Sequence, residues 1–157
     1  MTAFVDTPKL IVRILSKEPM YAYDENDMLI ASGGTAGYCA IAKLPGSKYD
    51  LRYIQAWLNH PYTEKIFQIM GSDFEGGFTA RGTYLLKKIP FVELDFDDEK
   101  QKALYESVII STKKINELNI VLEQKKDKAS ISVIEAEKEN LSKQIEDNIT
   151  KIYNLQF

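Results

Sequence analysis

The sequence contains one cysteine, Cys39, and one histidine, His60, among its 157 residues. A single cysteine excludes an internal disulfide, and one cysteine with one histidine cannot form the Cys/His cluster of a structural zinc site. No apolar run approaches the roughly 20 residues that a membrane span needs, and residues 1–9 lack the pattern of an export signal. We therefore expect a cytoplasmic protein with no metal, no cofactor and no membrane partner.

Excess positive charge is also missing, because the formal net charge is -3. Residues 1–95 contain ten basic and eleven acidic side chains, and residues 96–157 contain ten and twelve. Neither part has the basic field that draws a small protein nonspecifically onto nucleic acid. If the chain binds DNA, a few local residues must provide the attraction.

Glycine and proline are absent from the last third of the chain. All 8 glycines and all 5 prolines precede residue 96, and a charged, periodic sequence follows. Because these residues interrupt regular structure, the change predicts a mixed region of strands, turns and short helices followed by long helices. We predict an α+β fold, with a twisted sheet and short helices in residues 1–96 and an antiparallel helical hairpin in residues 97–157.

Within the first region, short apolar runs at residues 10–15, 28–31 and 38–42 are typical of strands. Residues 51–70 have apolar positions at helical spacing, and Pro61 can begin a new helix there, so two short helices are predicted. Glycines mark two loops, at residues 33–37 and 71–82.

The second region has two apolar stripes with the 4-3 spacing of a helical seam. The first stripe is Leu104, Val108, Ile115, Leu118 and Leu122, with Ser111 at the remaining position. The second is Ile131, Ile134, Leu141, Ile145, Ile152 and Leu155, with Lys138 and Asn148 at polar positions. A polar turn at residues 125–128 and a capping box at Ser132 and Glu135 favour a hairpin in which the stripes bury each other. The alternative is one continuous helix that needs an external partner.

Several patterns that suggest chemistry have simpler explanations. The glycines at 33–37 lack the Gly-Lys-Ser/Thr ending of a nucleotide loop, and His60 has no recognisable catalytic partners. The acidic residues 95–99 suit a helix start without any metal. Trp57 and Phe67 have the helical spacing of core residues rather than that of a base-stacking platform.

The loop at residues 71–88 is the best candidate for a contact surface. It gathers side chains that can donate hydrogen bonds to phosphates: Ser72, Thr79, Arg81, Thr83, Lys87 and Lys88. Such donors position DNA, and an arginine such as Arg81 can also bind guanine in the major groove. A solvated loop without a ligand remains an equally good interpretation of the composition alone.

Five short segments occur in an order that has a parallel among known proteins. They are TPKLIVR at 7–13 with YDE at 23–25, LRYIQAWLN at 51–59, GSDFEGGF to KIPF across 71–91, DEKQ at 98–101, and QIEDNITKIYNL at 144–155. Together they resemble the target-recognition region that follows the catalytic domain in Taq-type adenine DNA methyltransferases and in fused type IIG restriction-modification enzymes. Asn154 stands where that family has a glycine.

The resemblance implies a specificity domain that binds double-stranded DNA sequence-specifically and is not itself an enzyme. The chain has neither the cofactor-binding glycine loop nor the Asn-Pro-Pro-Tyr/Phe motif of these methyltransferases, so it would serve a methyltransferase or endonuclease elsewhere, as an excised domain or a split-gene product. The two loops should face the DNA, while Lys9 and Arg13 either touch phosphates or flank a core strand. The full set of expected DNA contacts is Lys9, Arg13, Thr35, Tyr38, Ser72, Thr79, Arg81, Thr83, Tyr84 and Lys87.

Two other functions stay open. A half-sized type I restriction specificity subunit would also bind DNA, but it would form a homodimer through its helices. A coiled-coil protein-interaction module would have no affinity for duplex DNA.

The missing motifs generate a first prediction: the chain neither binds S-adenosylmethionine nor methylates DNA. Isothermal calorimetry should show no saturable heat when the cofactor is titrated into the protein. Saturation at micromolar cofactor would contradict it.

Overall fold

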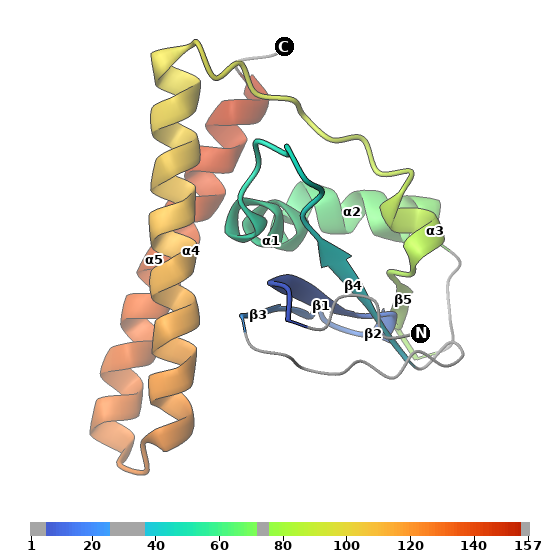
Figure 1. Ribbon diagram of the computed structural model, residues 1–157. Helices are drawn as coiled ribbons and strands as arrows, with labels where there is room; N and C mark the ends of the chain where they lie inside the picture. The colour runs from blue at the N-terminus through green and yellow to red at the C-terminus, as the bar shows by residue number, and fades with distance from the viewer. Residues whose placement is uncertain (1–5, 26–36, 72–75, 155–157) are drawn as a thin grey trace. The chain divides into compact units, whose positions relative to one another are not determined.

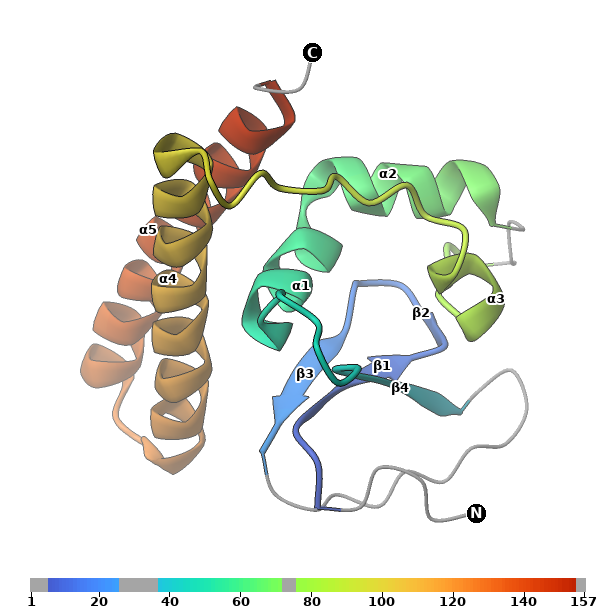
Figure 2. The ribbon, with the colours of Figure 1, turned by 45° about the horizontal axis from the view of Figure 1, so that its top comes forward.

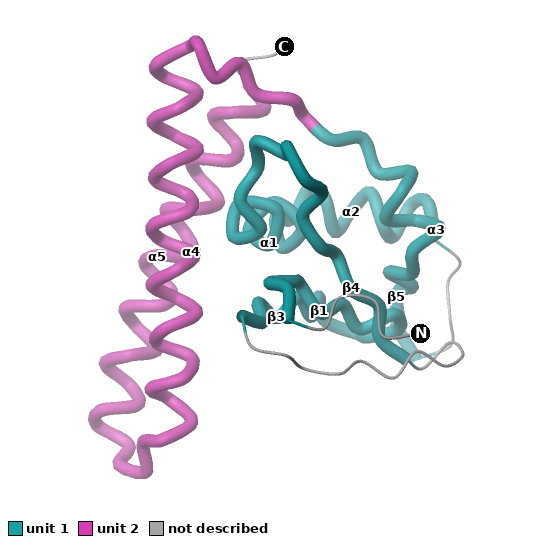
Figure 3. Tube along the Cα trace, viewed as in Figure 1, with its two compact units in different colours: residues 1–91 teal, residues 92–157 magenta. Residues whose placement is uncertain are grey.

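The computed structural model describes residues 6–25, 37–71 and 76–154. It divides into two compact units, Met1–Phe91 and Val92–Phe157, called unit 1 and unit 2 here (Figure 3). Unit 1 combines short strands with short helices, whereas unit 2 contains two long helices (Figure 1). The predicted α+β fold is confirmed. None of the helices within these described ranges is long and apolar enough to cross a membrane.

The centre of unit 1 is strand β1 (Lys9–Arg13), which pairs antiparallel with β3 (Tyr21–Asp24) and with β4 (Tyr38–Ala42). β1 has a hydrogen-bonded neighbour on each side, and its first four residues, which alternate between the two faces of the sheet, are all buried. This explains why the run is apolar without alternation. The strand predicted at 38–42 is confirmed, and the one predicted at 28–31 lies outside the described residues.

The strand predicted at 10–15 is divided at Ile14 between two sheets. β2 (Leu15–Ser16) leaves the first sheet and pairs with β5 (Thr79–Ala80) in a separate two-stranded sheet. The short apolar run gave no sign of this break, because the change of partner depends on residues more than sixty positions away.

Helices α1 (Leu51–Asn59) and α2 (Pro61–Met70) confirm the two predicted helices and the break at Pro61. The side chain of Asp50 caps α1 by accepting a hydrogen bond from the Arg52 amide at 2.7 Å. His60 caps α2, because its Nδ1 accepts from the Tyr62 amide at 3.2 Å. Figures 1 and 2 show α1 and α2 on the same side of the three-stranded sheet.

Three aromatic residues of these helices, Tyr53, Trp57 and Phe67, lie in the core, as predicted for Trp57 and Phe67, which are 6% and 0% exposed. The Phe91 ring stands edge-on to the rings of Trp57 and Tyr49, with centroids 4.9 and 4.8 Å apart. Phe91 thereby holds the last residues of unit 1 against α1.

In unit 2, α4 (Glu99–Gln124) and α5 (Lys128–Asn154) pack as a hairpin, so the single continuous helix is excluded. Seam residues Val108, Leu118, Ile145 and Ile152 are buried. The polar seam position Asn148 donates from Nδ2 to Ser107 Oγ at 3.0 Å, so it has a partner on the other helix. Pairing of this kind fixes the register of two helices more sharply than apolar contacts do.

The caps of the two long helices are aspartates. Asp98 accepts from the amides of Lys100 and Gln101 at 2.8 and 3.3 Å, which holds its pKa below the usual value. The expected capping box at Ser132 and Glu135 is wrong. α5 begins five residues earlier, where Asp127 accepts from the Ser130 amide at 2.8 Å. An aspartate is a strong cap by itself, and the earlier start lengthens the helix.

The hairpin generates a second prediction. Changing Leu118 or Ile145 to aspartate should destabilise the protein by about 3 kcal/mol, because each change removes a seam contact and buries a charge. Lys113 is exposed on α4, and Lys113→Asp should change stability by less than about 0.5 kcal/mol. Equal urea midpoints for the three variants would contradict burial of the seam.

Candidate functional site

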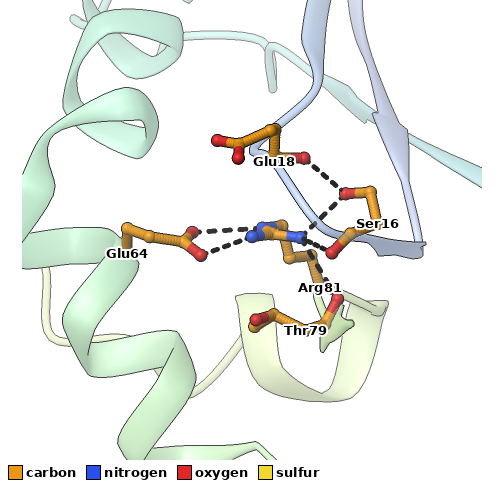
Figure 4. A network of polar contacts seen from close by, with 5 residues as sticks. All are labelled: Ser16, Glu18, Glu64, Thr79 and Arg81. Carbon is orange, nitrogen blue, oxygen red and sulfur yellow. Dashed lines mark hydrogen bonds and ion pairs between the residues drawn. The ribbon is translucent and has the colours of Figure 1, made fainter. Parts of the chain in front are cut away.

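A buried arginine organises the polar interior of unit 1. Arg81 is 0% exposed, and its guanidinium forms a two-point ion pair with Glu64 of α2, in which Nε lies 3.1 Å from Oε2 and Nη2 bonds Oε1. Its Nη1 donates to the Ser16 carbonyl at 2.9 Å and to Ser16 Oγ at 2.8 Å (Figure 4). It also donates to the Thr79 carbonyl at 3.1 Å. One side chain therefore ties together α2, β2 and β5.

The backbone of Arg81 is held as firmly as its side chain. Its amide donates to the Ile14 carbonyl at 2.6 Å, and the Ile14 amide donates to the Gly37 carbonyl at 3.1 Å. Ser16 Oγ in turn donates to the Glu18 carbonyl at 2.6 Å. The network therefore fixes the chain immediately before α3 (Thr83–Leu86).

Four exposed side chains follow this anchor, two on α3 and two in the turn directly after it. Thr83, Lys87 and Lys88 are exposed, and Tyr84 is 69% exposed. Lys88 Nζ lies 3.8 Å from the centroid of the Tyr84 ring and bonds the Tyr84 hydroxyl. Hydroxyl groups on α3 and ammonium groups in the turn that follows it form a set of hydrogen-bond donors with positive charge.

A second exposed pair lies where β4 begins. Arg13 and Tyr38 are direct cross-strand partners, so their side chains share one face of the sheet. Both are exposed, Tyr38 by 39%. The side chain of the next residue, Cys39, lies beside that of Thr83, which places α3 next to β4. Successive strand residues point to opposite faces, so the pair and α3 flank the start of β4 from both sides.

The structure therefore divides the predicted contact residues into three groups. Arg13, Tyr38, Thr83, Tyr84 and Lys87 are exposed around the start of β4 and on α3. Lys9, Thr79 and Arg81 are not exposed, and Thr35 and Ser72 lie outside the described residues.

Lys9 and Arg81 were expected to contact DNA, but both side chains are buried. Lys9 is 1% exposed, and its Nζ pairs with Asp24 Oδ2 at 2.8 Å, so it belongs to the core strand. Arg81 directs all of its polar atoms inward. Separating a buried ion pair costs about 3–5 kcal/mol, which a contact with a base would have to exceed.

Glu64 is the site residue that the sequence did not identify, and the contact of Lys88 with Tyr84 was not predicted. Glu64 is seventeen positions from Arg81, and its place in the first turn of α2 suggested only favourable helix electrostatics. Lys88 was grouped with the loop donors, but its contact with Tyr84 depends on the i, i+4 spacing of a helical turn.

The simpler explanations of the other polar residues hold. His60 is 3% exposed and serves as a helix cap, and Asp98 caps α4. Among the residues that the structure describes, no group of three or more His, Cys, Asp or Glu side chains could hold a metal ion.

Comparison with known proteins identifies the kind of enzyme that the chain resembles. No protein-family model matches the sequence. The chain is 35% identical over 148 residues to the type II restriction enzyme and methyltransferase RM.Eco57I of Escherichia coli. The aligned part is 94% of this chain and 15% of that protein. The chain is thus similar, over nearly all its length, to a small part of a restriction-modification enzyme.

Tyr21 generates a third prediction, because burial raises the pKa of its hydroxyl well above 10.0, and Glu64 adds to the rise while Arg81 opposes it. In the unfolded chain the tyrosine loses its proton near pH 10, and in the folded chain it keeps it. Stability should fall as the pH rises above 10, with a contribution from Tyr21 of at most about 1.4 kcal/mol per pH unit. Tyr21→Phe should remove that contribution in urea titrations between pH 9 and 11. An unchanged slope would contradict the assignment.

Proposed function

We propose that this chain is the DNA target-recognition domain of a restriction-modification enzyme of the Taq-type or type IIG class. The observation that carries the proposal is the alignment to 15% of a restriction enzyme and methyltransferase. The sequence has neither the cofactor loop nor the catalytic tetrapeptide, so this part of such an enzyme has a task other than methyl transfer. Selection of the DNA sequence is the task that the resemblance of the five segments supports.

In this proposal, α3 and the two lysines that follow it form the DNA face. Thr83, Tyr84, Lys87 and Lys88 supply hydroxyl and ammonium donors, which are the groups that bind phosphate and sugar oxygens. Arg13 and Tyr38 lie on the other face of β4 and do not belong to this face.

The distribution of charge in unit 1 also supports the proposal. Among its described residues, seven basic side chains are exposed: Arg13, Lys17, Lys43, Lys48, Lys65, Lys87 and Lys88. Three acidic side chains are exposed, namely Asp6, Glu18 and Glu25, and Glu25 pairs with Arg52. Asp27, Asp73 and Glu75 lie outside the described residues. Local attraction to DNA is therefore compatible with a net charge of -3.

The proposed partner is a methyltransferase or endonuclease domain or subunit. A half-sized type I specificity subunit would instead dimerise through its helices. The hairpin buries Val108, Leu118, Ile145 and Ile152 of its seams, while Ile110, Ile120 and Val133 are exposed apolar positions to which a second copy could bind. Mass in solution separates the two, since a type I half-subunit should be dimeric.

The proposed face generates a fourth prediction. Lys87→Ala should weaken binding to all duplexes alike and reduce the slope of log affinity against log salt by about one unit, because one phosphate contact is lost. Fluorescence anisotropy at several salt concentrations measures both quantities. The probes are a duplex selected by the wild-type chain from a random-sequence pool and a scrambled duplex of the same composition.

Lys125→Ala is the matched control, because Lys125 is an exposed lysine in the hairpin turn and its loss changes the net charge equally. The control should keep the wild-type slope. Identical slopes for Lys87→Ala and wild type would remove α3 from the DNA face, and a wild-type chain that selects no duplex would overturn the function itself.

A further inference from the structure

Helix α3 is too short to hold itself in place. It has four residues, and isolated helices of this length do not persist in water. The two-residue ladder between β2 and β5 that precedes it is also marginal alone. The orientation of the exposed donors must therefore come from another interaction.

We propose that Arg81 is a positioning residue for DNA recognition, which holds α3 and its donors in a fixed orientation while making no contact with DNA. This inference rests on the proposed function. The guanidinium joins Glu64 of α2, Ser16 of β2 and the carbonyl of Thr79, and the Arg81 amide joins Ile14. Thr83 follows two residues later, so little freedom remains between the anchor and the first donor.

The chemistry of the anchor requires arginine. Its planar fork offers two parallel N–H groups to the Glu64 carboxylate while Nη1 bonds Ser16 on another side. A lysine ammonium has no such planar fork and cannot reproduce this geometry. A donor set that is already ordered in the free protein binds more tightly, because less conformational freedom is lost on binding.

Glu64→Gln tests the inference, because it loosens the anchor without removing any proposed DNA contact. The substitution also raises the net charge by one unit, from -3 to -2, so electrostatics alone predicts tighter binding. Positioning predicts the opposite, namely affinity for the selected duplex about tenfold weaker at an unchanged salt slope. Amide hydrogen exchange should become faster at residues 79–88.

Asp24→Asn is the matched control. Lys9 and Asp24 form the other buried ion pair of unit 1 among the residues described, with side chains 2% and 11% exposed against 0% and 15% for Arg81 and Glu64. The control makes the same chemical change and the same change in net charge. It should lower the melting temperature but leave affinity within about a factor of two and leave exchange at 79–88 unchanged.

Ser16→Ala is the milder second variant, used if Glu64→Gln does not fold. It removes one acceptor of Nη1 and keeps the ion pair, so affinity should fall about threefold at an unchanged salt slope. Two results would overturn the positioning role and leave the DNA function intact. One is that the folded anchor variants bind the selected duplex as tightly as the wild-type chain does. The other is that Asp24→Asn loses as much affinity as the anchor variants do. Failure of the wild-type chain to bind any duplex would instead overturn the function.

Discussion

The interaction on which unit 1 depends is the burial of the Arg81 guanidinium. A cation removed from water must be neutralised and have its N–H groups bonded, and Glu64, Ser16 and Thr79 meet that requirement together. Since these partners come from three elements, the requirement can be met only when all three are in place. Strands of two to five residues thereby gain a cooperative constraint in addition to the apolar core of unit 1.

Local sequence patterns were sufficient for much of this architecture. Pro61 marked the boundary between α1 and α2, because proline suits the first position of a helix and His60 can cap the one that follows. The hairpin followed from two stripes with the same period and a polar turn between them. Trp57 and Phe67 were correctly placed in the core for the same reason. In each case, the signal lies within a few turns of one element.

The rest depended on contacts between distant residues. Arg81 was predicted to be a contact residue because glycines and hydroxyl side chains surround it in sequence. Its carboxylate partner, however, is Glu64 of α2, which is distant in sequence. Strand β3 was missed because its four residues, Tyr21–Asp24, become a strand only by pairing with β1. Of the expected site, the exposed residues Thr83, Tyr84 and Lys87 come together on α3, whereas Lys9 and Arg81 belong to the interior. A basic residue in a loop has the same local sequence whether it is solvated or buried.

The two buried ion pairs also shape the electric field of unit 1. Asp24 and Glu64 each face a buried cation, so their negative charge is cancelled inside the protein and little of it acts on the surroundings. Each pair also takes one cation, Lys9 or Arg81, away from the surface, so the two pairs together leave the net surface charge unchanged. A locally positive surface on a chain with more acidic than basic residues must therefore come from the positions of exposed basic side chains. Lys87 and Lys88 provide such a position, because two exposed ammonium groups follow α3 directly.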